Sequence, residues 1–330
     1  MSRWRRRVRR LAGRLLPPRA GAVVLGYHRL ADPRTAVGAE PRAMCVSPAN
    51  FAAQMAALRR IGRPVSLEHL AAALEAGSSV RGMIAVTFDD GYEEVLSVAL
   101  PVLEREEIPA TVFFVAGNQG GAFWWDHLAV LAAGADPGAP FRVSLGGSDF
   151  VWPGTGDIEQ LRKHLHRAIR VLDEEERCRG LERLAATWSS APPTSAGVVL
   201  PRSLTAEEAR RLAGSKWIDA GAHTVSHPPL AEIPPRRARE EIESSRAALA
   251  SGLGREVRTF SYPHGSFRTS TIELVRAAGY ELACSSTPDS VRPGVDRFAL
   301  PRVWVRDRGA AGLARHVRRF VGWSSRGTRR

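Results

Sequence analysis

The chain has 330 residues, of which 44% are hydrophobic, which supports a sizeable core and fits one α/β domain with room for an insertion. No apolar stretch is long enough for a transmembrane helix, and three widely spaced cysteines exclude a cysteine-based zinc knuckle. The net charge of +13 comes almost entirely from arginine. It is compatible with an acidic polymer, an anionic membrane or a nucleic acid as partner, and with a high-GC coding bias.

A basic segment, residues 1–20, begins the chain. Apolar residues from Trp4 to Leu15 would share one face of a helix there, so the segment either lies on a membrane surface or forms a disordered basic tail. Residues 10–18 are too interrupted by charge and proline to form the apolar part of a secretory signal. We therefore expect an unexported, cytoplasmic protein, with peripheral membrane contact left open. A second basic tail, residues 321–330, ends the chain.

Residues 21–320 alternate short apolar runs with helix-like stretches. This alternation predicts repeated βα units around a parallel sheet, as in an α/β barrel. The predicted strands are Ala22–Tyr27, Met83–Phe88, Thr111–Ala116, Trp217–Ala222, Val257–Tyr262 and Leu282–Ser285. The predicted helices of these units are Pro48–Ile61, Tyr92–Glu107, Pro235–Ser251 and Thr269–Ala278.

The alternation breaks between about residues 118 and 200. Two helix-like stretches, Ile158–Leu172 and Glu174–Trp188, lie there among pieces rich in glycine and proline. We interpret this region as an insertion that forms a lid or a wall of a substrate groove. Its tryptophans, Trp124 and Trp125, could stack on sugar rings or anchor the insertion to the main domain.

Two adjacent carboxylates, Asp89 and Asp90, end the apolar run Met83–Phe88. Buried carboxylates are costly unless they are paired, hydrogen-bonded or metal-bound, so this pair at a strand end predicts a functional site. Successive side chains of a strand face opposite ways, so the chain must bend here if both carboxylates serve one cavity. Gly91 permits that turn. The alternative is that Asp90 caps a following helix.

Two histidines four residues apart, His223 and His227, follow the apolar run Trp217–Ala222. Two imidazoles and one carboxylate with an open position form a recurrent catalytic zinc arrangement, and Asp90 or Asp89 would supply the carboxylate. Alone, such a pair often only caps helices or forms hydrogen bonds in loops. Beside the two aspartates, it predicts a divalent metal site, with Zn²⁺ expected first and Co²⁺ or another first-row ion as alternatives.

Three blocks of the sequence resemble the polysaccharide deacetylases of the NodB-homology group, metal-dependent enzymes that remove acetyl groups from amino sugars. Thr87–Tyr92 is similar to the family's first motif, His223–His227 to the second and Phe260–Gly265 to the third. The resemblance extends over most of the chain between about residues 20 and 305. It implies a distorted, incomplete (β/α) TIM-like barrel with a helical insertion.

The resemblance also implies roles for five residues. Asp89 corresponds to the general base, while Asp90, His223 and His227 correspond to the metal ligands. The position of His264 corresponds to the residue whose backbone N–H stabilises the oxyanion in the family.

Two departures from the family pattern concern the support of the base and the source of the acid. The third motif usually begins with an arginine that orients the catalytic aspartate, but the matching residue here is Ser261. Arg302 is our candidate replacement, and an ordinary surface arginine is the alternative. No late Leu-x-His block supplies the general acid. His28 is our candidate for that role, with a structural histidine as the alternative.

The sequence thus predicts a metal-dependent hydrolase that removes acetyl groups from N-acetylated sugars of a polysaccharide, oligosaccharide or glycan precursor. One alternative is a family member that binds glycan or metal without turnover, because of Ser261 and the missing histidine. The less favoured alternative is a basic nucleic-acid-binding protein. No RNA-binding or helix-turn-helix pattern stands out, so we expect no nucleic acid partner.

Overall fold

The structure is a computed structural model that describes residues 21–38, 44–188 and 199–321. The predicted basic segment 1–20 and all but the first residue of the predicted tail 321–330 lie outside the described residues. None of the helices in the described part of the chain has the length and apolar character needed to span a bilayer.

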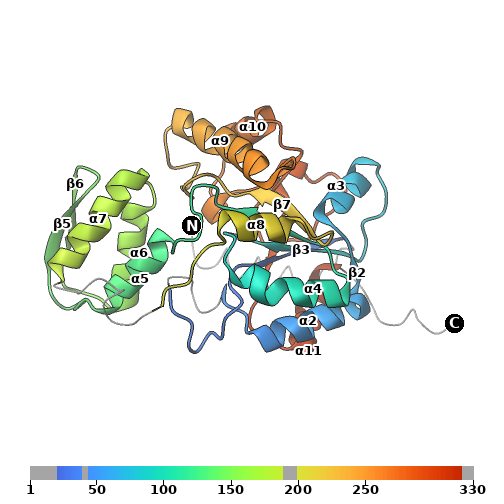
Figure 1. The fold of residues 1–330 in the computed structure, drawn as a ribbon, viewed down its shortest axis with the longest axis horizontal. Helices are drawn as coiled ribbons and strands as arrows, with labels where there is room; N and C mark the ends of the chain where they lie inside the picture. Colours follow the sequence, from blue (N-terminus) through green and yellow to red (C-terminus); the bar gives the residue numbers. More distant parts are fainter. Residues whose placement is uncertain (1–20, 39–43, 189–198, 322–330) are drawn as a thin grey trace, which may run out of the picture.

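An eight-stranded sheet in which every pairing is parallel forms the centre of the molecule (Figure 1). Its order is β10-β1-β3-β4-β7-β8-β9, and β2 pairs with β3 beside this path. The strands are β1 (Val23–Tyr27), β2 (Arg63–Pro64), β3 (Met83–Phe88), β4 (Ala110–Phe114), β7 (Ile218–Ala222), β8 (Thr259–Ser261), β9 (Leu282–Cys284) and β10 (Val303–Trp304).

The sheet curls so that its two edges approach each other. Cys284 in the edge strand β9 forms a parallel bridge with Leu300, which lies just before the opposite edge strand β10. The short strands at this end leave the barrel incomplete. The observed sheet confirms the predicted α/β class with a distorted, incomplete barrel.

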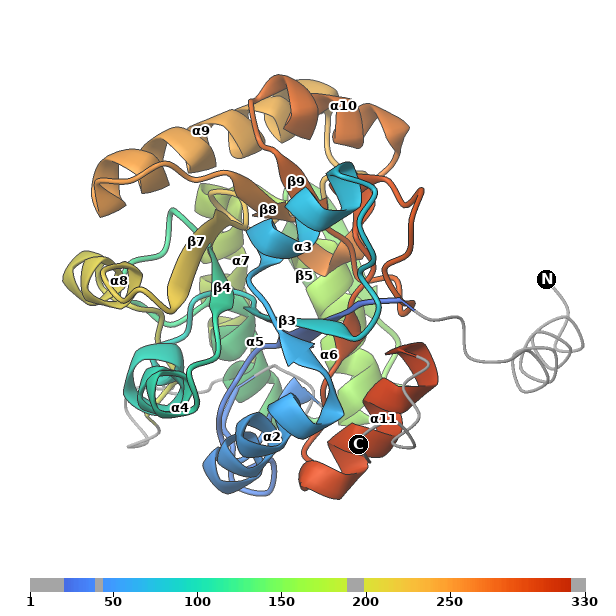
Figure 2. The same ribbon diagram turned by 90° about the vertical axis from the view of Figure 1, so that its right-hand side faces the viewer.

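Helices surround the sheet on its outer side (Figure 2). They bury apolar faces against the strands; in α2, for example, Phe51, Met55 and Leu58 follow the helical period and join the main core. The helices are α2 (Pro48–Ile61), α3 (Leu67–Glu75), α4 (Leu100–Glu106), α8 (Ala206–Ala213), α9 (Pro235–Leu253), α10 (Thr269–Ala277) and α11 (Ala310–Val321).

The predicted helix Tyr92–Glu107 is interrupted. A π-helical turn, Val95–Ala99, precedes the α-helix Leu100–Glu106. Pro101 has no N–H to bond to the carbonyl of Ser97, so the regular hydrogen-bond ladder cannot run through this point.

The insertion stands to one side of the barrel (Figure 1) and has its own small core. The two predicted helices are present, and they pack with an additional helix and an antiparallel hairpin that the sequence did not predict. These elements are α5 (Trp124–Ala133), β5 (Phe141–Leu145), β6 (Ser148–Trp152), α6 (Ile158–Ile169) and α7 (Glu174–Thr187).

Candidate active site

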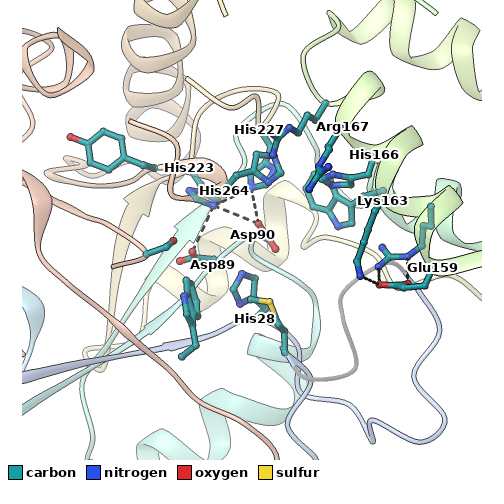
Figure 3. Close-up of a pocket in the computed structure, with 17 residues that line it drawn as sticks. His28, Asp89, Asp90, Glu159, Lys163, His166, Arg167, His223, His227 and His264 are labelled. Atoms are coloured by element: carbon teal, nitrogen blue, oxygen red, sulfur yellow. Dashed lines mark hydrogen bonds and ion pairs between the residues drawn. The ribbon is translucent and has the colours of Figure 1, made fainter. Parts of the chain in front are cut away.

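The predicted site residues follow the carboxyl ends of neighbouring parallel strands, so the fold gathers them at one rim of the sheet. His28 follows β1, Asp89 and Asp90 follow β3, and His223 follows β7. They line a cavity of about 670 Å³, together with His264 from the turn after β8 (Figure 3).

Asp90 and the histidine pair form a buried cluster. The Oδ1 atom of Asp90 lies 3.7 Å from Nε2 of His223 and 3.5 Å from Nε2 of His227. The two Nε2 atoms are 3.2 Å apart. Two ligands held tetrahedrally at about 2.0–2.1 Å from a metal lie roughly 3.3 Å apart, so this donor set fits a divalent cation.

Backbone bends bring the cluster together. Asp90 has φ 70°, which turns the chain at the end of β3 and places both carboxylates in one cavity. Asp90 does not cap a helix, since the first helical turn begins at Val95. His227 also lies in the left-handed region, with φ 60°. Such strained backbone conformations persist only where the surrounding structure fixes them, and they are typical of functional sites.

A second layer of hydrogen bonds orients the histidines. Nδ1 of His223 lies 2.7 Å from the carbonyl oxygen of Ser261, so Nδ1 carries the proton and Nε2 faces Asp90. The carboxylate of Glu241 accepts from the backbone N–H groups of Val225 and Ser226, each at 2.9 Å. Burial lowers the pKa of both His223 and His227, which keeps them in the neutral form that binds metals.

Asp89 has a different partner. The guanidinium of Arg302 donates to both of its carboxylate oxygens, at 2.6 and 2.7 Å. Arg302 is fully buried, so the alternative of a surface arginine is wrong. Burial would raise the pKa of Asp89, but the pairing with Arg302 and the nearby His223 outweigh it and hold that pKa well below its usual range. Asp89 is therefore ionised and fixed in orientation.

Ser261 lies between the base and this arginine. Its hydroxyl accepts a hydrogen bond from Nη2 of Arg302 at 2.9 Å and lies 3.4 Å from Oδ2 of Asp89. Ser261 thus takes the position of the family's arginine, and Arg302, which directly precedes β10, supplies a guanidinium beside it. The structure brings Arg302 to Asp89; its role in orienting the base stays a prediction.

His28 and His264 line the same cavity. The ring of His28 packs on Trp304 at 4.6 Å, and burial lowers the pKa of His28 to about 4. His28 is therefore neutral at neutral pH and would have to take up a proton before it donates one. His264 adopts φ 57° in a 3₁₀ turn, Pro263–Gly265, and its ring lies 4.5 Å from the ring of His227.

The sequence analysis named Trp125 as a possible anchor of the insertion, and the structure shows which residues it contacts. The ring of Trp125 packs on His227 at 4.6 Å, and its Nε1 donates to the hydroxyl of Tyr92 at 2.8 Å. Trp125 is buried, so it anchors the insertion beside the metal ligand. No sequence signal marks this contact, because it joins helix α5 to a loop about 100 residues further along the chain.

A group of cavity residues that the sequence analysis missed comes from helix α6, which presents charged side chains to the cavity (Figure 3). The spacing of these residues by three and four positions along the helix could have revealed this face. The α6 residues that line the cavity, counting Arg170 at its end, are Glu159, Arg162, Lys163, His166, Arg167 and Arg170.

Comparisons with known proteins identify the family of the chain. Residues 76–142 and 182–283, just over half of the chain, match the family model for polysaccharide deacetylases. Over 111 residues the chain is 25% identical to YxkH of Bacillus subtilis (strain 168), which is provisionally named a polysaccharide deacetylase. That match covers 34% of this chain and 39% of YxkH, so the chain spans about two fifths of this relative.

Two solved structures share the fold. The deacetylase PplD of Streptococcus pyogenes, solved with acetate, is 16% identical, has a TM-score of 0.58, and matches over 90% of this chain and 98% of its own. IcaB of Ammonifex degensii is 22% identical, also has a TM-score of 0.58, and matches over 90% of this chain and 97% of its own. These matches confirm the predicted NodB-type barrel. With the family model, they show that the chain belongs to the polysaccharide deacetylase family, a family of hydrolases acting on carbon–nitrogen bonds.

Proposed function

We propose that the protein is a metal-dependent deacetylase that hydrolyses N-acetyl groups on the sugars of a polysaccharide or glycan precursor. One observation carries this proposal. A buried carboxylate and two neutral imidazoles converge beside a second carboxylate that is paired with a buried arginine, all at the wall of an open cavity.

Asp90, His223 and His227 would hold the cation, and their mixture of nitrogen and oxygen donors favours Zn²⁺, followed by Co²⁺. When bound, such a cation lowers the pKa of its water toward about 7 and polarises the acetyl carbonyl.

Asp89 would accept the proton of the attacking water. Asp89 is ionised, so it can accept a proton, and Arg302 fixes its orientation toward the cavity. Arg302 would be a positioning residue, since it contacts Asp89 rather than the reacting atoms. The guanidinium balances the charge of Asp89 within the protein, while Asp90 lies with the two histidines in the candidate metal cluster.

The remaining steps need a donor to the oxyanion and a proton for the leaving amine. The backbone N–H of His264 would stabilise the oxyanion, an interaction worth about 3–4 kcal/mol in other hydrolases. His28 would carry a proton to the amine. Its position in the same cavity as Asp89 supports this assignment.

Acetate release from N-acetylglucosamine oligosaccharides tests the proposal. We expect release by the zinc-loaded protein, loss of release after treatment with a chelator, and recovery on adding Zn²⁺. Asp89→Asn should lower kcat by about 10²-fold or more while the protein keeps its metal.

Asp149→Asn, on the exposed hairpin of the insertion, is the matched control and should retain full activity. A protein that holds metal and binds the oligosaccharide but releases no acetate would instead be the impaired family member. A protein that neither holds metal nor releases acetate contradicts the proposal.

A further inference from the structure

Helix α6 has two chemically different faces. Leu161, Leu165 and Ile169 are buried in the core of the insertion. The opposite face lines the cavity of the candidate active site (Figure 3). We call four of its cationic residues the basic wall: Arg162, Lys163, Arg167 and Arg170.

The basic wall lies close to the candidate metal ligands. The ring of His166, on the same face of α6, is 5.4 Å from the ring of His264, which is in turn 4.5 Å from the ring of His227. His166, on the same helix face as the wall, is therefore linked to the candidate ligand His227 through the ring of His264. A group on the sugar that carries the acetyl, or on its neighbour, would face the wall.

Part of the wall's charge is balanced within the protein. Arg162 and Lys163 share one carboxylate, that of Glu159, at 2.9 and 3.2 Å. Lys163 therefore shares its one paired carboxylate with a second cation.

The other two cations of the wall differ in whether they are paired. Arg170 is neutralised by Glu232 at 2.8 Å. Arg167 makes no ion pair or side-chain hydrogen bond with any residue that the structure describes. Burial, followed by the field of the arginines around it, lowers the pKa of His166 to about 4. Within the described part of the chain, Arg167 therefore brings to the cavity a positive charge that no ion pair balances.

The overall arginine excess of the chain does not explain this charge. Residues 118–188 of the insertion contain eight Arg or Lys against ten Asp or Glu, so this region is slightly acidic. Its cavity face carries four cations and one anion. Half of these basic residues, but only one of the ten acidic residues, thus lie on the surface of the insertion that faces the site.

We propose that the basic wall binds an anionic group of the substrate, a carboxylate or a phosphate, next to the N-acetylated sugar. Guanidinium groups match the geometry of both anions. The two aspartates of the site do not balance the charge of the wall, because Asp89 is paired with Arg302 and Asp90 lies in the candidate metal cluster. This inference rests on the proposed function and specifies its substrate class.

The test compares kcat/KM for anionic and neutral probes in variants of the wall. The carboxylate probe is a hexasaccharide of alternating N-acetylglucosamine and glucuronate, the phosphate probe is farnesyl diphosphoryl N-acetylglucosamine, and the neutral probe is chitohexaose. The measured quantity is the ratio of anionic to neutral kcat/KM. Because variants are compared with the wild type, differences between the probes in linkage and length cancel.

We expect Lys163→Gln combined with Arg167→Gln to lower this ratio about tenfold for the carboxylate probe, the phosphate probe or both, mainly through KM. The affected probe identifies the source of the anion. Glu159→Gln removes the only carboxylate on this face of α6 and should raise the same ratio. Arg142→Gln, on the exposed hairpin, is the matched control and should leave the ratio unchanged. Ratios within twofold of the wild type in all variants would overturn the inference.

A binding measurement separates failure of this inference from failure of the proposed function. If the wild type releases no acetate from any probe, the proposed function fails. Calorimetric titration with the glucuronate hexasaccharide and with the diphosphate probe then decides the role of the wall. Binding that weakens in the Lys163→Gln, Arg167→Gln variant supports it, and equal or absent binding of both probes overturns it.

Discussion

Arg302 reaches Asp89 past strand β1, since Asp89 follows β3, Arg302 directly precedes β10, and β1 lies between these two strands. The chain buries this arginine completely and surrounds it with Trp304 and Phe113, whose rings lie 4.7 and 5.6 Å from the guanidinium carbon. The bidentate geometry depends on the planar fork of arginine, which lysine cannot reproduce.

We therefore predict that Arg302→Lys lowers kcat more than tenfold while the metal content stays the same. A change confined to KM would argue against a role in positioning the base. Arg302→Met would leave Asp89 buried without a counter-charge and should destabilise the fold by about 3–5 kcal/mol, measured by urea unfolding. Ser261→Ala is the control, because it removes only the hydrogen bonds of one hydroxyl and keeps the ion pair.

Sequence analysis could propose Arg302 only because the family pattern showed a missing arginine at Ser261. The alignment of Asp89, Ser261 and Arg302 depends on how three strands far apart in the sequence are ordered in the sheet. The bend at Asp90 was easier to anticipate, since two adjacent carboxylates on a strand share a cavity only if the backbone turns. The packing of Trp125 on His227 had no local signal.

At the scale of elements, helix α9 supports the loop that carries the histidines. Glu241 projects from this helix and accepts from two backbone N–H groups and, in addition, from the hydroxyl of Ser226. Glu241 is buried, and its loss would leave these donors without their acceptor.

We predict that Glu241→Ala weakens metal binding by about 10- to 100-fold, because it removes a residue that orients the ligand loop. Metal titration with a competing chelator measures this change. Glu240→Gln, on the exposed side of the same helix, is the control and should bind metal like the wild type. An unchanged affinity in Glu241→Ala would show that the loop holds its shape without this carboxylate.

The elements themselves were largely predictable from apolar periodicity. Helix α2 and strand β3 have the predicted bounds, and the other five predicted strands are present with ends that differ by one or two residues. The hairpin β5–β6 was missed because its strands are mostly exposed and carry a weak alternating pattern. The sequence also could not show that the charged face of α6 meets the cavity, since that depends on how the insertion packs against the barrel.

At the scale of the whole molecule, the barrel gathers the base and the ligands at the carboxyl ends of its strands, and the insertion supplies the opposite wall of the cavity (Figures 1 and 3). The two parts differ in charge, because the barrel side presents Asp89 and Asp90 while the insertion side presents the basic wall. This division separates the reacting centre from the surface proposed to select the substrate.

The central claim is that Asp90, His223 and His227 hold a divalent cation while Asp89 stays bound to Arg302. Anomalous diffraction from crystals grown with Zn²⁺ tests it most directly. The account predicts one zinc peak about 2.0–2.2 Å from a carboxylate oxygen of Asp90 and from Nε2 of both histidines, with the Asp89–Arg302 pair intact. A cavity without a zinc peak, or a zinc ion bound by Asp89 with Asp90 turned away, would contradict it.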